Sequence, residues 1–217
     1  MLGKTHIATT GAIASGSVMV SYILYQKPPA IWGFSHVTAW LNEPFMRMLG
    51  LHWDNAYLAT NFLNMAQLGL MFHLIFLISA CCFGALLPDI DTNTSILGRY
   101  VPFIGAVVPH RTITHTLWAV LALGFPTYFI NDPYLYALWF GYVLHIIEDS
   151  FSRQGIAWLY PFITYTRYGS GAVIKKGRNP KWFYYRTGSA TEKGIYYAMS
   201  TIWFVFSVQF VYLMYFA

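Results

Sequence analysis

The stretch AQLGLMFHLIFLISACCFGALLPDIDT, residues 66–92, joins a long apolar segment to two aspartates. Ala66–Leu87 approaches the about 20 apolar residues that a helix needs to cross a bilayer. Asp89 and Asp91 follow immediately after Pro88. Ionisable residues beside a membrane segment are costly to bury and are therefore candidates for a functional site. The stretch predicts a membrane helix with a polar site at its end.

The composition of the whole chain is also typical of a membrane protein. Of its 217 residues, 57% are hydrophobic and 10% are charged, whereas soluble domains carry about 25% charged residues. The formal net charge of +5 is explained by membrane topology, so no nucleic-acid partner is expected. Cys81 and Cys82 are adjacent, which indicates small packing residues rather than a disulfide. We expect residues 1–217 to form a single membrane-embedded domain.

Four further segments approach membrane length, so we expect an all-α integral membrane bundle of about five transmembrane helices. The five segments are Ile7–Tyr25, Ala66–Leu87, Thr116–Ile130, Tyr134–Phe151 and Ile195–Phe216. The third and fourth are separated only by residues 131–133, which is typical of a tight helical hairpin. Gly11 and Gly16 in the first segment would let another helix approach closely. Residues 26–65 are expected to form a link in the external membrane interface.

The basic residues predict the orientation of this bundle. All lysines and arginines except Lys27 and Arg47 fall on the side that holds the N-terminus and the links after the second and fourth segments. The positive-inside rule makes that side cytoplasmic. We therefore expect a multi-pass protein of the inner or plasma membrane.

Residues able to bind metal gather at the same cytoplasmic ends of the predicted helices. The candidate metal ligands are His6, Asp89, Asp91, His110, His115, His145 and Asp149. His145 and Asp149 are four residues apart and share one helix face. Asp89 and Asp91 are expected in an extended stretch, where residues two apart point the same way. Both acidic pairs follow helix C-termini, where the helix dipole disfavours negative charge, so a metal ion would stabilise them.

The types of these ligands indicate the metal. Imidazole and carboxylate groups suit zinc, with manganese or iron as alternatives, and seven ligands are enough for two or three ions. His73 is excluded, because it lies about 24 Å along the helix from Asp89. It is expected to be an interior hydrogen-bonding residue.

Arg111, Asp91 and Arg186 complete the predicted site as catalytic residues. Arg111 lies between the histidines of VPHRTITHT, residues 108–116, and its planar guanidinium would hold a phosphate oxygen. Arg186, like Arg153, is a further candidate for neutralising phosphate charge, because it precedes a helix start at the capping box of Ser189 and Glu192. Each motif alone has a plain structural explanation, such as a helical hydrogen bond, a solvated turn or a topology charge. Their shared location favours a site.

Several motifs resemble those of the YdjM-like family of LexA-regulated, membrane-bound, metal-dependent hydrolases. They are THIATTGA, GALLPDIDTNTS, HRTITHT, HIIEDSFSRQGIAWLYPF and RTGSATE. The ligand order is also similar to that of zinc-dependent phospholipase C and of single-strand nucleases of the three-zinc type. That resemblance implies metal ligands at His6, Asp89, His110, His145 and Asp149. The soluble enzymes have a further histidine after the HxxxD motif, and this chain has none after His145.

We expect a membrane-bound, metal-dependent hydrolase that acts on a phosphate ester or diester. A membrane lipid or lipid phosphate is the favoured substrate, because the site would lie at headgroup depth. Clustered metal ions stabilise both the attacking and the leaving oxygen of such a reaction. The alternative is a non-enzymatic membrane adaptor or ion-handling protein, whose structural metal would have every coordination position filled by protein. A membrane metalloprotease ranks third, because the sequence has no HExxH motif.

The predicted topology is tested by thiol labelling of intact cells with a membrane-impermeant reagent. A single cysteine at Gly177 should stay unlabelled until the membrane is permeabilised, because the link after the fourth segment is expected in the cytoplasm. A single cysteine at Lys27 serves as the external control and should be labelled directly. Labelling of the Gly177 variant from outside would reverse the orientation.

Overall fold

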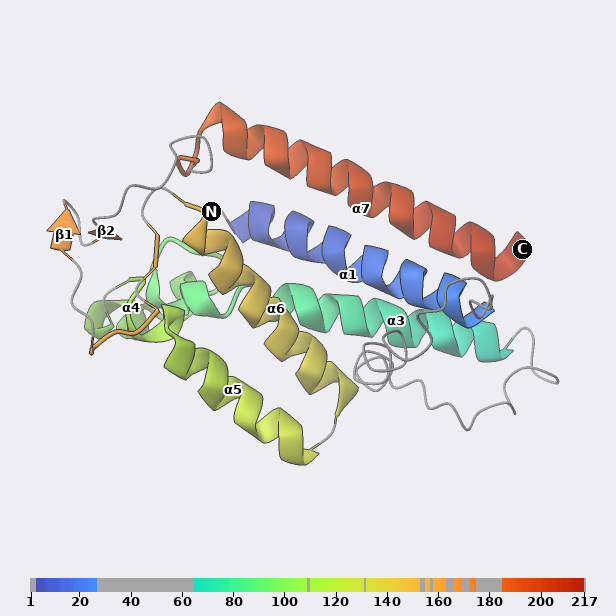
Figure 1. Ribbon diagram of the computed structural model, residues 1–217, viewed down its shortest axis with the longest axis horizontal. Helices are drawn as coiled ribbons and strands as arrows, with labels where there is room; N and C mark the ends of the chain where they lie inside the picture. The colour runs from blue at the N-terminus through green and yellow to red at the C-terminus, as the bar shows by residue number, and fades with distance from the viewer. Residues whose placement is uncertain are drawn as a thin grey trace, which may run out of the picture.

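A bundle of long helices dominates the described part of the chain (Figure 1). The computed structural model describes residues 3–26, 65–108, 110–130, 132–152, 155–156, 158–162, 166–168, 172–174 and 185–216. The long helices are α1 (Gly3–Gln26), α3 (Met65–Gly84), α5 (Leu117–Ile130), α6 (Pro133–Ser150) and α7 (Ala190–Phe216). They match the five predicted segments to within a few residues at most ends. The predicted link between α1 and α3 lies outside the described residues.

Short elements cover the end of this bundle that holds the predicted site. They are η2 (Pro88–Asp91), η3 (Gly98–Tyr100), α4 (Pro102–Val107) and η4 (Ile113–His115). Two strands, β1 (Thr166–Tyr168) and β2 (Ala172–Ile174), pair antiparallel. The expectation of a purely α-helical chain missed this small hairpin, because three-residue strands leave almost no periodic signal in a sequence.

Two helices of the described chain are long and apolar enough to cross a membrane. These candidate spans are Phe72–Asp91 and Ala190–Tyr212. The apolar helix α5 has 14 residues and is therefore about 21 Å long, which is shorter than the hydrocarbon core of a bilayer. Helix α1 buries Thr5, Thr9 and Thr10, and these polar residues lower its hydropathy. Helices are thus present at all five predicted places, and two of them qualify as membrane spans.

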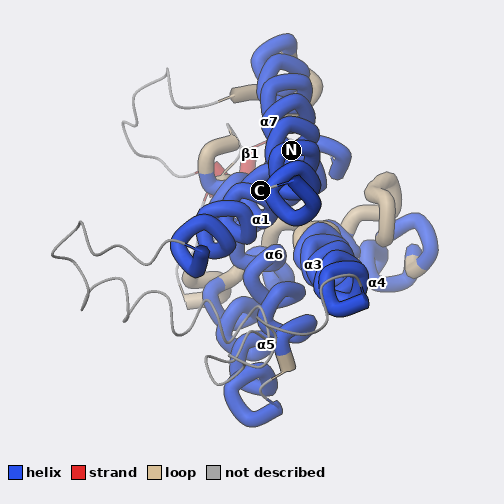
Figure 2. The backbone as a smooth tube through the Cα atoms, turned by 90° about the vertical axis from the view of Figure 1, so that its right-hand side faces the viewer, coloured by secondary structure: helices blue, strands red, loops and turns tan. Residues whose placement is uncertain are grey.

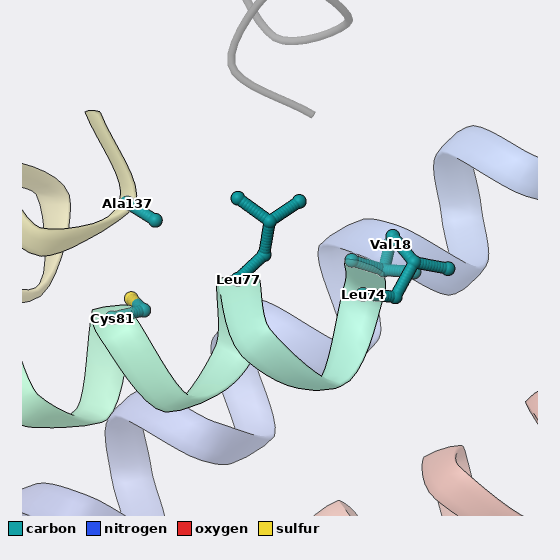
Figure 3. Packing of buried hydrophobic residues seen from close by; sticks show 5 residues of the cluster. All are labelled: Val18, Leu74, Leu77, Cys81 and Ala137. Carbon is teal, nitrogen blue, oxygen red and sulfur yellow. The ribbon is translucent and has the colours of Figure 1, made fainter. Parts of the chain in front are cut away.

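The helices pack in a continuous series from α7 to α5. Helix α1 lies between α7 and α3, and α6 contacts both α3 and α5 (Figures 1 and 2). Figure 3 shows a core cluster in which Leu74, Leu77 and Cys81 of α3 meet Val18 of α1 and Ala137 of α6. Both cysteines are free, as predicted, and Cys81 is a buried packing residue of this cluster, whereas Cys82 is half-buried. This packing fixes the positions of the helix ends relative to one another.

Glycines allow the closest helix contacts. Gly11 and Gly16 of α1 lie against aromatic side chains of α7, and a Cβ at either position would collide with them, which confirms the predicted close approach. The contact between α3 and α6 is tighter. A Cβ on Gly84 would overlap the carbonyl oxygen of Leu138, and one on Gly141 would overlap the carbonyl oxygen of Cys81. The two backbones therefore touch directly.

The residues predicted to form the site sit at one end of the bundle. Figure 1 shows the start of α1, the end of α3, the start of α5, the end of α6 and the start of α7 at the same end, on the left of that view. The elements η2 and η4 contact each other there. Four separate chain segments therefore bring their polar residues to one place.

The close α3–α6 contact predicts that adding one methyl group at Gly141 lowers the stability of the protein. Gly141→Ala should lower the free energy of unfolding by about 1–3 kcal/mol, as overpacking of a well-packed core does, because backbone atoms cannot yield as a side chain can. Gly194→Ala on α7 is the matched control, since nothing lies within 4 Å of its added Cβ. Thermal unfolding of both variants in the same detergent micelles measures the difference. Equal unfolding midpoints would show that α3 and α6 do not touch at Gly141.

Candidate metal centre

Asp89 and Asp91 reach the site through a tight turn rather than an extended stretch. The turn η2 begins at Pro88, and the Thr92 amide donates to the carbonyl oxygen of Asp89 at 3.0 Å. The Ser95 hydroxyl donates to the same oxygen at 2.7 Å. The prediction of an extended stretch was wrong, because proline at the first position favours a helical turn. The turn instead directs the carboxylates into two neighbouring groups of ligands.

The first group contains two carboxylates and two imidazoles whose ligand atoms lie within 4.8 Å of one another. Its members, all buried, are Asp89, His115, His145 and Asp149. The Nε2 atoms of His115 and His145 lie 3.7 and 3.6 Å from Asp89 Oδ1. They lie 3.8 and 3.9 Å from Asp149 Oδ2. These separations are too long for hydrogen bonds. They are close to the edges, about 3.3 Å, of a tetrahedron of zinc ligands.

Hydrogen bonds orient the two histidines of this group. His145 Nδ1 donates to the carbonyl oxygen of Ala85 at 2.6 Å. His115 Nδ1 lies 2.9 Å from the hydroxyl oxygen of Thr114 and 3.4 Å from Asp91 Oδ2. With one proton held at Nδ1, each Nε2 is directed into the group and would offer its lone pair to a metal ion that displaces any second proton.

These Nε2 atoms have no hydrogen-bond partner. The Nε2 atoms of His6, His115 and His145 are buried without one in the described structure. Buried polar atoms are nearly always satisfied, and an exception needs an explanation. A metal ion between Asp89 and Asp149 would satisfy the Nε2 atoms of His115 and His145, so the residues present fit the metal that the sequence predicts.

A second group shares His115 with the first and adds Asp91 and His110. His110 Nδ1 lies 2.7 Å from Asp91 Oδ1, which is a hydrogen bond. The other oxygen of Asp91 accepts hydrogen bonds from the Arg111 amide at 3.1 Å and the Thr114 hydroxyl at 2.5 Å. Both carboxylate oxygens are therefore engaged by protein donors. In this arrangement Asp91 orients the two histidines.

The side chain of Arg111 is directed at a carboxylate of the site. Its Nη2 atom lies 2.7 Å from Asp149 Oδ2, and its Nη1 atom donates to Ser152 Oγ at 2.7 Å and to the carbonyl oxygen of Gly155 at 3.1 Å. The residue is 4% exposed and has a left-handed backbone with φ of 63°. Left-handed geometry is uncommon for a residue with a Cβ and costs about 1 kcal/mol or more. The phosphate-binding role predicted for Arg111 therefore competes with its bonds to protein.

The site concentrates negative charge in a buried place. Asp89, Asp91, Glu148 and Asp149 are all buried there, half of the 8 acidic residues of the chain. Among the described residues, the guanidinium of Arg111 contacts one of them, Asp149. Burial alone would lower the pKa of His115, but the negative charge of the neighbouring Asp89, Asp91 and Asp149 carboxylates outweighs burial and raises that pKa to about 9. The carboxylates thus favour positive charge at the position of the ligand atoms.

His6 also enters this site, beside the first group. It is completely buried, and its ring stacks on that of His145 with 3.8 Å between centroids. Its Nε2 atom lies 3.4 Å from Asp149 Oδ1. Its Nδ1 atom is paired with Glu148, a residue that the sequence interpretation passed over although it stands beside Asp149 in the HIIED motif.

Other predicted residues lie outside the metal groups. Arg186 is exposed, unlike the buried ligands. The predicted helix start is confirmed, because the Glu192 amide donates to Ser189 Oγ at 3.3 Å and the Glu192 carboxylate accepts from the Gly188 amide at 2.5 Å. His73 is bonded to the Tyr134 hydroxyl at 2.7 Å, as expected of a hydrogen-bonding residue remote from the site. Arg153 lies outside the described residues.

Comparison with known proteins identifies the family. Residues 56–216 match the family described as YdjM inner membrane protein. The uncharacterized protein YvsG of Bacillus subtilis is 39% identical over 84 residues, 36% of this chain and 52% of that protein. The inner membrane protein YdjM of Escherichia coli is 36% identical over 87 residues, 35% of this chain and 44% of that protein. The matched part thus spans about half the length of these relatives.

No solved structure matches the chain. The family match covers most of the sequence, from before α3 to the end of α7, and includes every predicted ligand except His6. It confirms the resemblance seen in the sequence motifs. The chain belongs to the YdjM family of inner membrane proteins.

Proposed function

We propose that this protein is a metal-dependent hydrolase of phosphate esters. The observation that carries the proposal is the convergence of buried imidazole Nε2 atoms without hydrogen-bond partners on the carboxylates of Asp89 and Asp149. A protein gains nothing in stability from such an arrangement without a cation, because each unsatisfied buried nitrogen is unfavourable.

Zinc is the metal that best suits the first group. Two imidazoles and two carboxylates are common zinc ligands, while manganese and iron accept the same donors. We assign one ion to Asp89, His115, His145 and Asp149. A second ion between His110, His115 and Asp91 would require the hydrogen bond from His110 to Asp91 to break. A bound divalent ion supplies a Lewis acid for a phosphoryl oxygen and lowers the pKa of a water molecule.

The surrounding residues hold the ligands in position. Asp91 and Thr114 fix the ring of His115, the Ala85 carbonyl fixes that of His145, and Arg111 fixes the carboxylate of Asp149. Such partners of metal ligands set their orientation and basicity. Under this proposal Arg111 is a positioning residue, and its contact with substrate, expected from the sequence, is secondary.

His110 is the residue through which protons can leave the site. Its side chain is 39% exposed, whereas the other three histidines of the site are completely buried. The bond to Asp91 keeps a proton at Nδ1, so Nε2 is the atom free to exchange a proton with solvent or a leaving group. His110 therefore marks the entrance.

A lipid-borne substrate fits the surroundings of this entrance. Phe103 and Val107 of α4 are 68% and 80% exposed, and Ile113 beside His110 is 56% exposed. Exposed apolar residues next to membrane-length helices are expected in contact with lipid. We propose a multi-pass protein with this end at the cytoplasmic headgroup level and a phospholipid or lipid phosphate as substrate.

A structural metal in a non-enzymatic adaptor is the second candidate. The complete burial of His115 and His145 favours it, since structural sites are closed while catalytic sites keep an open position. The two candidates differ in hydrolysis of phosphate esters by the purified, metal-loaded protein. If the His110→Ala variant binds the full amount of metal and still hydrolyses phosphate esters, His110 takes no part in the reaction. The proposal of a hydrolase would stand in that case.

The zinc content of histidine variants distinguishes the proposed metal ligands from histidines elsewhere in the chain. His145→Ala should lower the zinc bound by purified protein at least tenfold, because it removes a ligand from a four-residue group. His73→Ala is the control and should retain zinc, since His73 is bonded to Tyr134 on the same bundle. Elemental analysis and a phosphatase and phospholipase panel measure both variants. Equal zinc loss in both would place the metal elsewhere.

Arg111→Lys distinguishes the two roles of this arginine. Lysine keeps the charge but cannot reach Asp149, Ser152 and Gly155 together, so the metal-free variant should lose about 1.5–3 kcal/mol of stability, as for a lost hydrogen bond to a charged group. Arg99→Lys is the exposed control. Thermal unfolding without metal gives the answer. If Arg111→Lys left the stability unchanged but abolished phosphatase activity, the result would support the predicted phosphate-binding role of Arg111.

A further inference from the structure

Glu148 is a buried carboxylate to which the proposed hydrolase gives no role. It is 8% exposed and lies next to the ligand Asp149 on α6. Its Oε2 atom is 2.5 Å from Nδ1 of His6. Its backbone carbonyl accepts a hydrogen bond from the Tyr185 hydroxyl at 3.2 Å. A buried charge is unfavourable unless it is paired, so the His6 contact is what keeps this carboxylate in place.

His6 is the partner of Glu148 and the residue of α1 that reaches the site. The ring is completely buried and stacks on His145 with an angle of 23° between ring planes. Its Nε2 atom lies 3.4 Å from Asp149 Oδ1 without forming a hydrogen bond. That distance again matches an edge of about 3.3 Å between zinc ligands.

The pairing decides which nitrogen of His6 is available. A carboxylate at Nδ1 holds the proton there, leaves the lone pair on Nε2 and makes the ring a stronger ligand. If His6 and Glu148 formed only a structural ion pair, His6 Nε2 would not need to be buried beside Asp149 without a hydrogen bond. We infer that Glu148 is a positioning residue that turns His6 into a metal ligand and thereby attaches α1 to the metal centre.

This inference rests on the proposed metal site but goes beyond the family match. That match begins at residue 56, so α1 (Gly3–Gln26) precedes it. Asp149 joins the two parts of the centre, because its Oδ2 faces His115 and His145 while its Oδ1 faces His6. The metal would therefore link α1 to η2, η4 and α6 at this end of the bundle.

Cobalt binding to the full chain in detergent micelles tests the role of Glu148. Glu148→Gln and His6→Ala should each weaken the cobalt Kd, measured by chelator competition, about 10–100-fold, the usual effect of losing a partner of a metal ligand. Both should change the visible cobalt spectrum in the same way. The double variant should bind no more weakly than His6→Ala alone, because the two residues act as one unit.

Glu192→Gln is the matched control, because Glu192 is equally buried but caps α7; it should keep the wild-type Kd and spectrum. A wild-type Kd in Glu148→Gln, or additive losses in the double variant, would overturn the inference while leaving the hydrolase proposal intact. Failure of the wild-type chain to bind cobalt would overturn both. If Glu148→Gln does not fold, an unchanged Kd in His6→Ala overturns the inference by itself.

Discussion

The direct contact between the backbones of α3 and α6 is the constraint on which the site depends. At Gly84 and Gly141 no side chain separates the two backbones. This approach brings the Ala85 carbonyl, one residue beyond α3, within 2.6 Å of His145 on α6. The hydrogen bond then fixes which nitrogen of His145 faces Asp89. A contact made for packing thus also supports a proposed metal ligand.

The second constraint is electrostatic. Among the described residues, four buried carboxylates meet a single arginine side chain, Arg111, and would otherwise repel one another and favour unfolding or protonation in an apolar bundle. The histidines relieve part of this repulsion, and a divalent cation between the Nε2 atoms of His115 and His145 and the carboxylates of Asp89 and Asp149 would relieve more of it. The same charge explains why the ligands come from several segments, since no single helix end can hold so many acids. Under the proposed function, one ion would therefore serve both the stability and the chemistry of this protein.

Sequence patterns predicted the helices and the shared helix ends well, because apolar length and motif position are local properties. They also separated His73 from the site by its distance along a helix. They missed the turn at Pro88, the small hairpin and the bonds of Arg111, because these depend on contacts between distant segments. Glu148 was visible beside Asp149, but nothing local shows that α1 delivers His6 to it. The close α3–α6 contact was missed for the same reason.

X-ray absorption at the zinc edge of the purified full-length protein tests the central claim most directly. The account predicts a first shell of nitrogen and oxygen at about 2.0–2.1 Å, with the outer-shell scattering of at least two imidazoles. A sulfur shell at about 2.3 Å would instead place the metal at Cys81 and Cys82. A spectrum of that kind, or a protein that binds no metal at all, would contradict the account.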